Sequence, residues 1–104
     1  MTPEGKVKKE LDAYLGSLGA DCWYFKPMNF GYGRNGIPDY IICYKGFFLA
    51  PETKKAGGKS QPWQEKEQER IRIAGGFSDR VTSVEEVKIW IACIDDMADK
   101  LNAP

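Results

Sequence analysis

Residues 36–64 read GIPDYIICYKGFFLAPETKKAGGKSQPWQ, and they determine the architecture expected for the whole chain. An apolar run, Tyr40–Tyr44, is followed by a turn at Lys45 and Gly46 and by a second run that starts at Phe47 and continues to residue 54. Two such runs joined by a two-residue turn with glycine predict a β-hairpin. The first run has so few polar residues that we expect its strand to be buried on both faces.

Helices and further strands are expected on both sides of this hairpin. Thr2 and Pro3 predict the start of a first helix that ends at Gly19, and residues 22–26 read as a strand. A second helix is expected from residues 60–62 to about 74, and a short strand near Val81. Ser83-x-x-Glu86 predicts the capping box of a last helix that continues to about residue 101. The order helix, three strands, helix, strand, helix predicts a mixed α/β domain.

The composition limits the chemistry open to the chain. Its 104 residues suit a single domain, residues 1–104, and 42% hydrophobic with 29% charged residues are typical of a globular protein. The sequence contains no histidine, which excludes histidine-dependent catalytic triads and histidine-ligated metal sites. Carboxylates, lysines and amides must therefore supply any catalysis, with a metal bound through oxygen ligands.

Three cysteines and the absence of long apolar runs indicate the compartment. Cys22, Cys43 and Cys93 are odd in number and widely spaced, so we expect free, mostly buried thiols of a reducing cytosol. The N-terminal residues do not resemble a secretory signal, and no run approaches the length of a membrane span. We therefore expect a cytoplasmic protein without a membrane partner.

Residues 31–36, GYGRNG, match the G-x-G-x-x-G dinucleotide fingerprint. That fingerprint requires a helix immediately after it, whereas here a proline and an apolar strand follow. We therefore interpret the segment as an irregular loop whose backbone and Arg34 approach a phosphate group.

Acidic and basic side chains are expected to meet at one end of the hairpin. Asp39 precedes the first strand, and folding about the turn brings it close to Glu52 on the second. Alternation along a strand places Lys54 on the same face as Glu52. Two carboxylates suit Mg²⁺ or Mn²⁺, and an ammonium group can orient a water molecule or stabilise charge on phosphorus. Taken alone, Glu-x-Lys is better explained as an ordinary surface strand, and the full pattern with the hairpin favours the site.

The balance of 15 basic and 15 acidic residues conceals an uneven distribution of charge. Residues 45–72 hold seven basic and four acidic side chains, whereas residues 73–104 hold three basic and six acidic ones. The positive excess surrounds the predicted site, so a net charge of zero does not argue against nucleic-acid binding.

Several motifs occur in one order along the chain: Gly36-x-Pro38-Asp39, Glu52-x-Lys54, the loop Gly57–Lys59, Gln64 and Ala74–Gly76. Together they resemble the PD-(D/E)xK nuclease motif, and more narrowly the VRR-NUC group of virus-type replication and repair nucleases. The resemblance extends from Glu4 to the glycine pair at 75–76. It implies a restriction-endonuclease-like αβββαβ core, with a mixed sheet flanked by helices and one additional C-terminal helix.

The resemblance also implies roles for individual residues. Asp39 and Glu52 would bind the metal, together with the main-chain carbonyl of Thr53. Lys54 would position or activate the attacking water, and Gln64 would support the site from the second helix.

Two positions leave alternatives open. Glu4 matches a family acidic residue that helps to hold metal or water, with Glu10 in its place if the register of the first helix differs. An acidic residue in the first helical turn is also expected from the helix dipole alone. Pro51 stands where the family has an aliphatic residue, and proline disturbs strand pairing.

The activity implied by the resemblance is hydrolysis of DNA phosphodiester bonds by a divalent-metal-dependent, structure-specific endonuclease. Its substrate would be branched DNA such as Holliday junctions, in a phage or bacterial intracellular setting. Small stand-alone members of the group resemble dimeric junction resolvases, which suggests a homodimer. A DNA-binding or partner-recognition module with a degraded site is the alternative that Pro51 motivates, and an enzyme acting on ordinary duplex is a third.

Two further groups of residues have both a functional and a structural interpretation. Lys55, Lys59 and Trp63 are candidates for contact with a DNA backbone, and they equally suit a solvated loop and helix face. The apolar stripe of the last helix suits the core, with a homodimer surface as the alternative.

Overall fold

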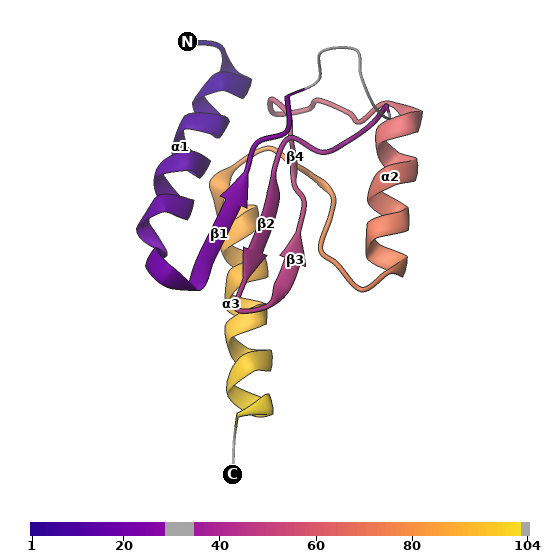
Figure 1. Cartoon of the computed structure of the whole chain (residues 1–104). Helices are drawn as coiled ribbons and strands as arrows, with labels where there is room; N and C mark the ends of the chain where they lie inside the picture. The colour runs from indigo at the N-terminus through magenta and orange to yellow at the C-terminus, as the bar shows by residue number, and fades with distance from the viewer. Residues whose placement is uncertain (29–34, 103–104) are drawn as a thin grey trace.

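The computed structural model describes residues 1–28 and 35–102 (Figure 1). Its elements are, in order, α1 (Pro3–Ser17), the short 3₁₀ helix η1 (Gly19–Asp21), β1 (Cys22–Phe25), β2 (Ile41–Tyr44), β3 (Phe47–Leu49), β4 (Glu52–Thr53), α2 (Pro62–Ile73), β5 (Arg80–Val81) and α3 (Val84–Leu101). This order, with antiparallel and parallel strands and a C-terminal helix, confirms the predicted α/β class. Arg34, like most of the GYGRNG segment, lies outside the described residues.

The hairpin forms at the predicted turn. Lys45 and Gly46 have φ angles of 50° and 85°, and two successive positive values are typical of the tight turns that join twisted strands. Beyond the turn, Ile42 pairs with Leu49 in antiparallel register. β1 pairs with the other edge of β2, which gives the strand order β1-β2-β3.

The strand expected over residues 47–54 is divided at Pro51 into β3 and β4. The register of the hairpin places residue 51 opposite Tyr40, where proline has no N–H to donate, and the pairing with β2 ends at Leu49. The chain instead continues along β5. Amides at alternate positions donate to carbonyl oxygens there: Ala50 to Phe77 (2.7 Å), Glu52 to Asp79 (3.0 Å) and Lys54 to Val81 (2.9 Å). The nitrogen of Pro51 faces away from β5, so this parallel ladder loses no hydrogen bond.

The helices begin close to the predicted caps. Thr2 Oγ1 accepts a hydrogen bond from the N–H of Gly5 (3.0 Å), and α1 follows with proline in its first turn. α3 begins after Ser83 as expected, although Glu86 accepts from the N–H of Thr82 (2.9 Å) rather than from the N–H of Ser83.

The core lies between one face of the sheet and the helices α1 and α3, with α3 passing behind the strands in Figure 1. The α3 stripe contributes Val87, Ile91 and Ile94 to this core, whereas Leu101 near its end is 76% exposed. Most of the stripe is therefore core rather than free surface. None of the helices in the described part of the chain is long and apolar enough to cross a membrane.

The opposite face of the sheet is exposed. Trp23 and Phe25 of β1 stack with ring centroids 6.4 Å apart, and Phe48 of β3 lies on the same face. Cys43 of β2 is exposed between them. The expectation of a strand buried on both faces was wrong, because an apolar run does not specify which element covers it. The cysteines are free as expected, but Cys43 and Cys93 are exposed rather than buried.

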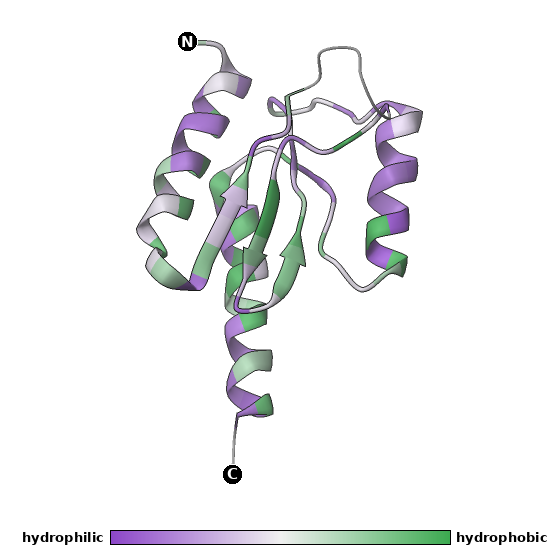
Figure 2. Ribbon diagram, in the orientation of Figure 1, coloured by the Kyte–Doolittle hydropathy of each residue, from purple (hydrophilic) through white to green (hydrophobic). Residues whose placement is uncertain are grey.

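α2 is more hydrophilic than the other helices, with apolar residues gathered toward its C-terminal end (Figure 2). It begins and ends close to the predicted residues, and the side chains of Gln61 and Gln64 form a capping box at its start. Its buried residues are the polar Glu67 and Gln68, and Gln68 Nε2 donates to Ser60 Oγ (3.0 Å). This hydrogen bond joins α2 to the loop that precedes it.

Gly36 packs the segment before β2 against the start of α2. Its φ is +82°, and a Cβ atom there would lie 2.8 Å from the carbonyl carbon of Trp63 and closer still to the oxygen. Gly57 also has positive φ, +78°, but a Cβ atom would meet no described atom within 4 Å. We expect both alanine variants to lose about 1–2 kcal/mol for the left-handed conformation, and Gly36→Ala to lose more because of the clash. Thermal denaturation followed by circular dichroism checks this, and equal melting temperatures would contradict the close packing.

Candidate functional site

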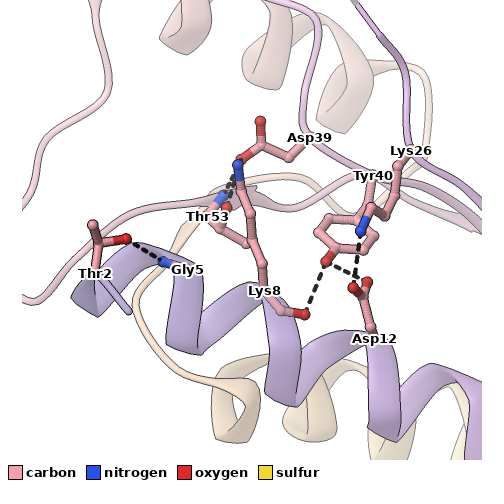
Figure 3. Close-up of polar contacts among 8 residues, drawn as sticks. All are labelled: Thr2, Gly5, Lys8, Asp12, Lys26, Asp39, Tyr40 and Thr53. Atoms are coloured by element: carbon pink, nitrogen blue, oxygen red, sulfur yellow. Dashed lines mark hydrogen bonds and ion pairs between the residues drawn. The ribbon is translucent and has the colours of Figure 1, made fainter.

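Asp39 lies just before β2 and contacts β4. Its Oδ2 accepts hydrogen bonds from the main-chain N–H (2.9 Å) and from Oγ1 (2.6 Å) of Thr53 (Figure 3). The N–H and C=O of a strand residue point to the same edge, so the carbonyl of Thr53 also faces the side of β4 on which Asp39 lies. Because the ladder with β2 ends before Pro51, this edge of β4 is open to the carboxylate. The predicted approach of Asp39 to the second strand is confirmed.

Glu52 supplies the neighbouring carboxylate and is only 3% exposed. Its Oε2 is buried without a hydrogen-bond partner among the described residues. Burial, then the negative charge of Asp39 and a hydrogen bond between the two side chains, raises the pKa of Glu52 to about 8, although Lys54 and Lys8 act in the opposite direction. Two adjacent carboxyl groups, one of them buried, are unfavourable in the ionised state unless a cation lies between them.

Two lysines bring positive charge to this pair. Lys54 is half-buried on the strand that carries Glu52, and its charge lowers the pKa of that carboxyl group. Lys8 comes from α1, and its Nζ lies 4.0 Å from Asp39 Oδ2 (Figure 3). The sequence analysis missed Lys8. The signal was present in its spacing, since a residue four positions after Glu4 lies on the same face of a helix.

The chemistry of the pair fits a divalent metal bound through oxygen. Asp39, Glu52 and the carbonyl of Thr53 are the hard donors that Mg²⁺ and Mn²⁺ prefer. A bound cation would give the buried Oε2 atom a partner and remove the repulsion between the carboxylates. Within residues 1–28 and 35–102, no group of three acidic or cysteine side chains gathers closely enough to hold a metal. Glu4 and Glu10 therefore do not join the pair, and a metal role for either stays a prediction.

The remaining predicted residues lie on the loop and helix that follow β4. The Oε1 atom of Gln64 accepts a hydrogen bond from the N–H of Gln61 (2.8 Å), so this glutamine caps α2, and its support of the site stays a prediction. Lys55 and Lys59 are exposed on the loop, and Trp63 is 53% exposed in the first turn of α2. These three side chains are thus accessible to a large ligand.

Comparison with known proteins supports the architecture independently of the site. No family model and no curated protein matches the chain. A solved structure described as a VRR_NUC domain superposes with a TM-score of 0.72 and 30% sequence identity, covering 88% of this chain and 97% of that one. The match spans nearly the whole of the solved domain, and the fold is the one that the sequence motifs implied. The chain therefore belongs to the VRR-NUC domain family, a family of nuclease-type domains.

Proposed function

We propose that the chain is a Mg²⁺- or Mn²⁺-dependent endonuclease that hydrolyses phosphodiester bonds in branched DNA, such as a four-way junction. The observation that supports this best is the juxtaposition of Asp39 with Glu52, whose Oε2 atom is buried and unpartnered within the described chain. Lys54 adds the cation that the motif requires. The family supports a nuclease-type domain, and these side chains support the particular chemistry.

Asp39, Glu52 and the Thr53 carbonyl would hold the metal, which would supply Lewis-acid stabilisation of the charge on the phosphate oxygens. Lys54 would orient the attacking water through its Nζ atom and stabilise the negative charge that develops. The water oxygen forms a new bond to phosphorus as the bond from phosphorus to O3′ breaks. A proton reaches O3′, and the products are a 5′-phosphate and a 3′-hydroxyl.

The exposed residues beside the site suit a DNA backbone. Lys55 and Lys59 offer charge to phosphates without reading sequence, and Trp63 offers an exposed ring. We extend the proposal to Arg34 because of its position in the sequence. Lys55 follows Glu52 by three residues in the chain, so a DNA backbone bound there would lie close to the carboxylate pair.

One carboxylate pair cuts one strand, whereas resolving a four-way junction requires two opposing cuts. We therefore propose that the active form is a homodimer, with its sites related by a two-fold axis. Since the α3 stripe is mostly buried in the core, it does not supply an extended dimer surface.

Cleavage of a supercoiled plasmid that extrudes a cruciform tests the function. We expect no cleavage in EDTA, and Mg²⁺- or Mn²⁺-dependent linear product from paired cuts across the junction. A monomer would produce nicked circles instead, and equal cleavage of a relaxed plasmid without a cruciform would show an enzyme of ordinary duplex. Binding to the junction without cleavage in any metal would contradict the proposal and support the degraded-site alternative.

The degraded-site alternative depends on the disturbance that Pro51 causes in the strand. Pro51 does interrupt the pairing with β2, which ends at Leu49, but the disturbance is limited to that side of the strand. The parallel ladder passes Pro51 with its hydrogen bonds made on both sides, at Ala50 and Glu52. Because the pairing with β2 ends before Pro51, the edge of β4 that faces β2 is free to donate hydrogen bonds to Asp39.

A further inference from the structure

Tyr40 ties α1 to the carboxylate pair. Its side chain is completely buried, and its hydroxyl donates to Asp12 Oδ1 (2.6 Å) and lies 3.1 Å from the carbonyl oxygen of Lys8 (Figure 3). Lys26 Nζ holds the other oxygen of Asp12 at 2.8 Å. Tyr40 directly follows Asp39 in the chain. The hydrogen bonds of Tyr40 set the position of α1 along β2. They therefore also determine which α1 side chain lies next to Asp39.

Lys8 is the α1 lysine that these contacts place next to Asp39. Its backbone carbonyl contacts Tyr40, and its Nζ lies 4.0 Å from Asp39 Oδ2 with 40% of the side chain exposed. The neighbouring Lys6 and Lys9 are exposed. A half-exposed lysine beside a carboxylate pair can shift its ammonium group by rotating its flexible stem.

We propose that Lys8 binds a non-bridging phosphate oxygen of the DNA beside the metal-binding pair, an inference that rests on the proposed nuclease function. In the free protein, the ammonium group lies beside the Asp39 carboxylate, and its positive charge favours ionisation of the neighbouring Glu52. A divalent cation held by these carboxylates would repel the Lys8 ammonium group, because both are positive. Lys8 would then pair with the nearest other anion, the DNA phosphate bound beside the carboxylates.

If Lys8 has this role, replacing it should change metal binding and DNA binding in opposite directions. Removing the Lys8 charge removes a competing cation, so metal binding to the free protein becomes tighter. The same change removes a phosphate contact, so DNA binding becomes weaker and less dependent on salt. A lysine that only supported the fold would weaken both kinds of binding when replaced.

The experiment compares Lys8→Met with Lys9→Met, which removes the same charge from the next, exposed position. Isothermal titration calorimetry with Mn²⁺ and no DNA should show binding about three- to tenfold tighter for Lys8→Met, as for removal of a like charge. Fluorescence anisotropy with a labelled four-way junction in Ca²⁺ should show binding weakened about tenfold, with a salt slope smaller by about 1. We expect Lys9→Met to match the wild type in both measurements, and Lys8→Arg to retain the DNA affinity.

The outcomes separate this inference from the function on which it rests. If the wild type binds Mn²⁺ and cleaves the junction but Lys8→Met behaves like Lys9→Met, only the role of Lys8 is overturned. Weaker binding of both Mn²⁺ and DNA by Lys8→Met also overturns it, in favour of a structural role. A wild type that neither binds Mn²⁺ nor cleaves overturns the proposed function itself.

Discussion

Replacing Asp39 with asparagine is expected to lower the rate constant of DNA cleavage by about a hundred- to a thousandfold, the scale for loss of one preorganised electrostatic contact in an active site, with little change in the melting temperature. The amide oxygen can still accept the hydrogen bonds that Thr53 donates from its N–H and Oγ1. It carries no negative charge, so the site loses half of its carboxylate pair. The variant therefore removes the chemistry and keeps the contact between β2 and β4.

Alanine at the same position separates these two roles. Asp39→Ala removes the acceptor and leaves the donors of Thr53, a completely buried residue, without their partner. A buried donor left unsatisfied costs about 1–3 kcal/mol, so this variant should lose stability as well as activity. Single-turnover cleavage and thermal denaturation measure the two effects. Asp96→Asn, on the exposed side of α3, is the control, and cleavage by Asp39→Asn within tenfold of the control would contradict the assignment.

Replacing Glu52 with glutamine is expected to stabilise the metal-free protein while abolishing metal binding and cleavage. The folded-state pKa of Glu52 is raised from 4.5 to about 8 by burial and by Asp39. For a raised pKa, the contribution to stability is fully present below the unfolded value and is lost as the pH rises toward the folded value. The free energy of unfolding of the wild type should therefore fall by about 1.4 kcal/mol for each pH unit between pH 4.5 and 8.

Glutamine cannot ionise, so this variant should lack that part of the pH dependence. In EDTA at pH 8 its melting temperature should exceed that of the wild type by about 15–20 °C or more, since each kcal/mol is worth several degrees in a domain of this size, and at pH 4.5 the two should be close. Adding Mn²⁺ should raise the melting temperature of the wild type alone, because only the wild type retains the paired carboxylates. Circular dichroism melts at pH 4.5, 6.5 and 8 measure these differences. Parallel pH profiles for the two proteins would rule out the buried charge as their source.

Such a result would identify Glu52 as a residue kept for function at a cost in stability. A buried carboxyl oxygen without a hydrogen-bond partner is uncommon in folded proteins, and in the described part of the chain Glu52 Oε2 is such an atom, at the edge of β4. The same reasoning explains why Lys54→Met should lower cleavage strongly without a comparable gain in stability, since Lys54 opposes the rise in the pKa of Glu52.

The sequence predicted those features of the site that depend on local geometry. The Lys45 and Gly46 turn sets the hairpin register, and that register brings Asp39 to the strand that carries Glu52. Helix starts followed from Thr2 and from the proline in the first turn of α2 for the same reason. In each case the relevant contacts lie within a few residues or across one tight turn.

Features that depend on how separate elements pack could not be predicted from local patterns. The position of Lys8 depends on the rotation of α1 over the sheet, which the contact of Tyr40 with Asp12 determines. The exposure of Trp23 depends on which helices cover the sheet. Gln64 fits both the nuclease motif and a helix-capping role. In the structure its side chain caps the start of α2.

The division of the strand at Pro51 has a consequence for the order in which the protein folds. The hairpin closes over a short loop. The pairing of β4 with β5 instead closes a loop that contains all of α2, as the hydrogen bond from Ser78 to Ala50, 28 residues apart, shows. Closing the longer loop has the larger entropic cost, so we expect β4 to dock late, after the rate-limiting barrier. A cation that binds only after this docking would slow unfolding and leave the refolding rate unchanged. Metal ions would then protect the protein kinetically, by lengthening the lifetime of the native state.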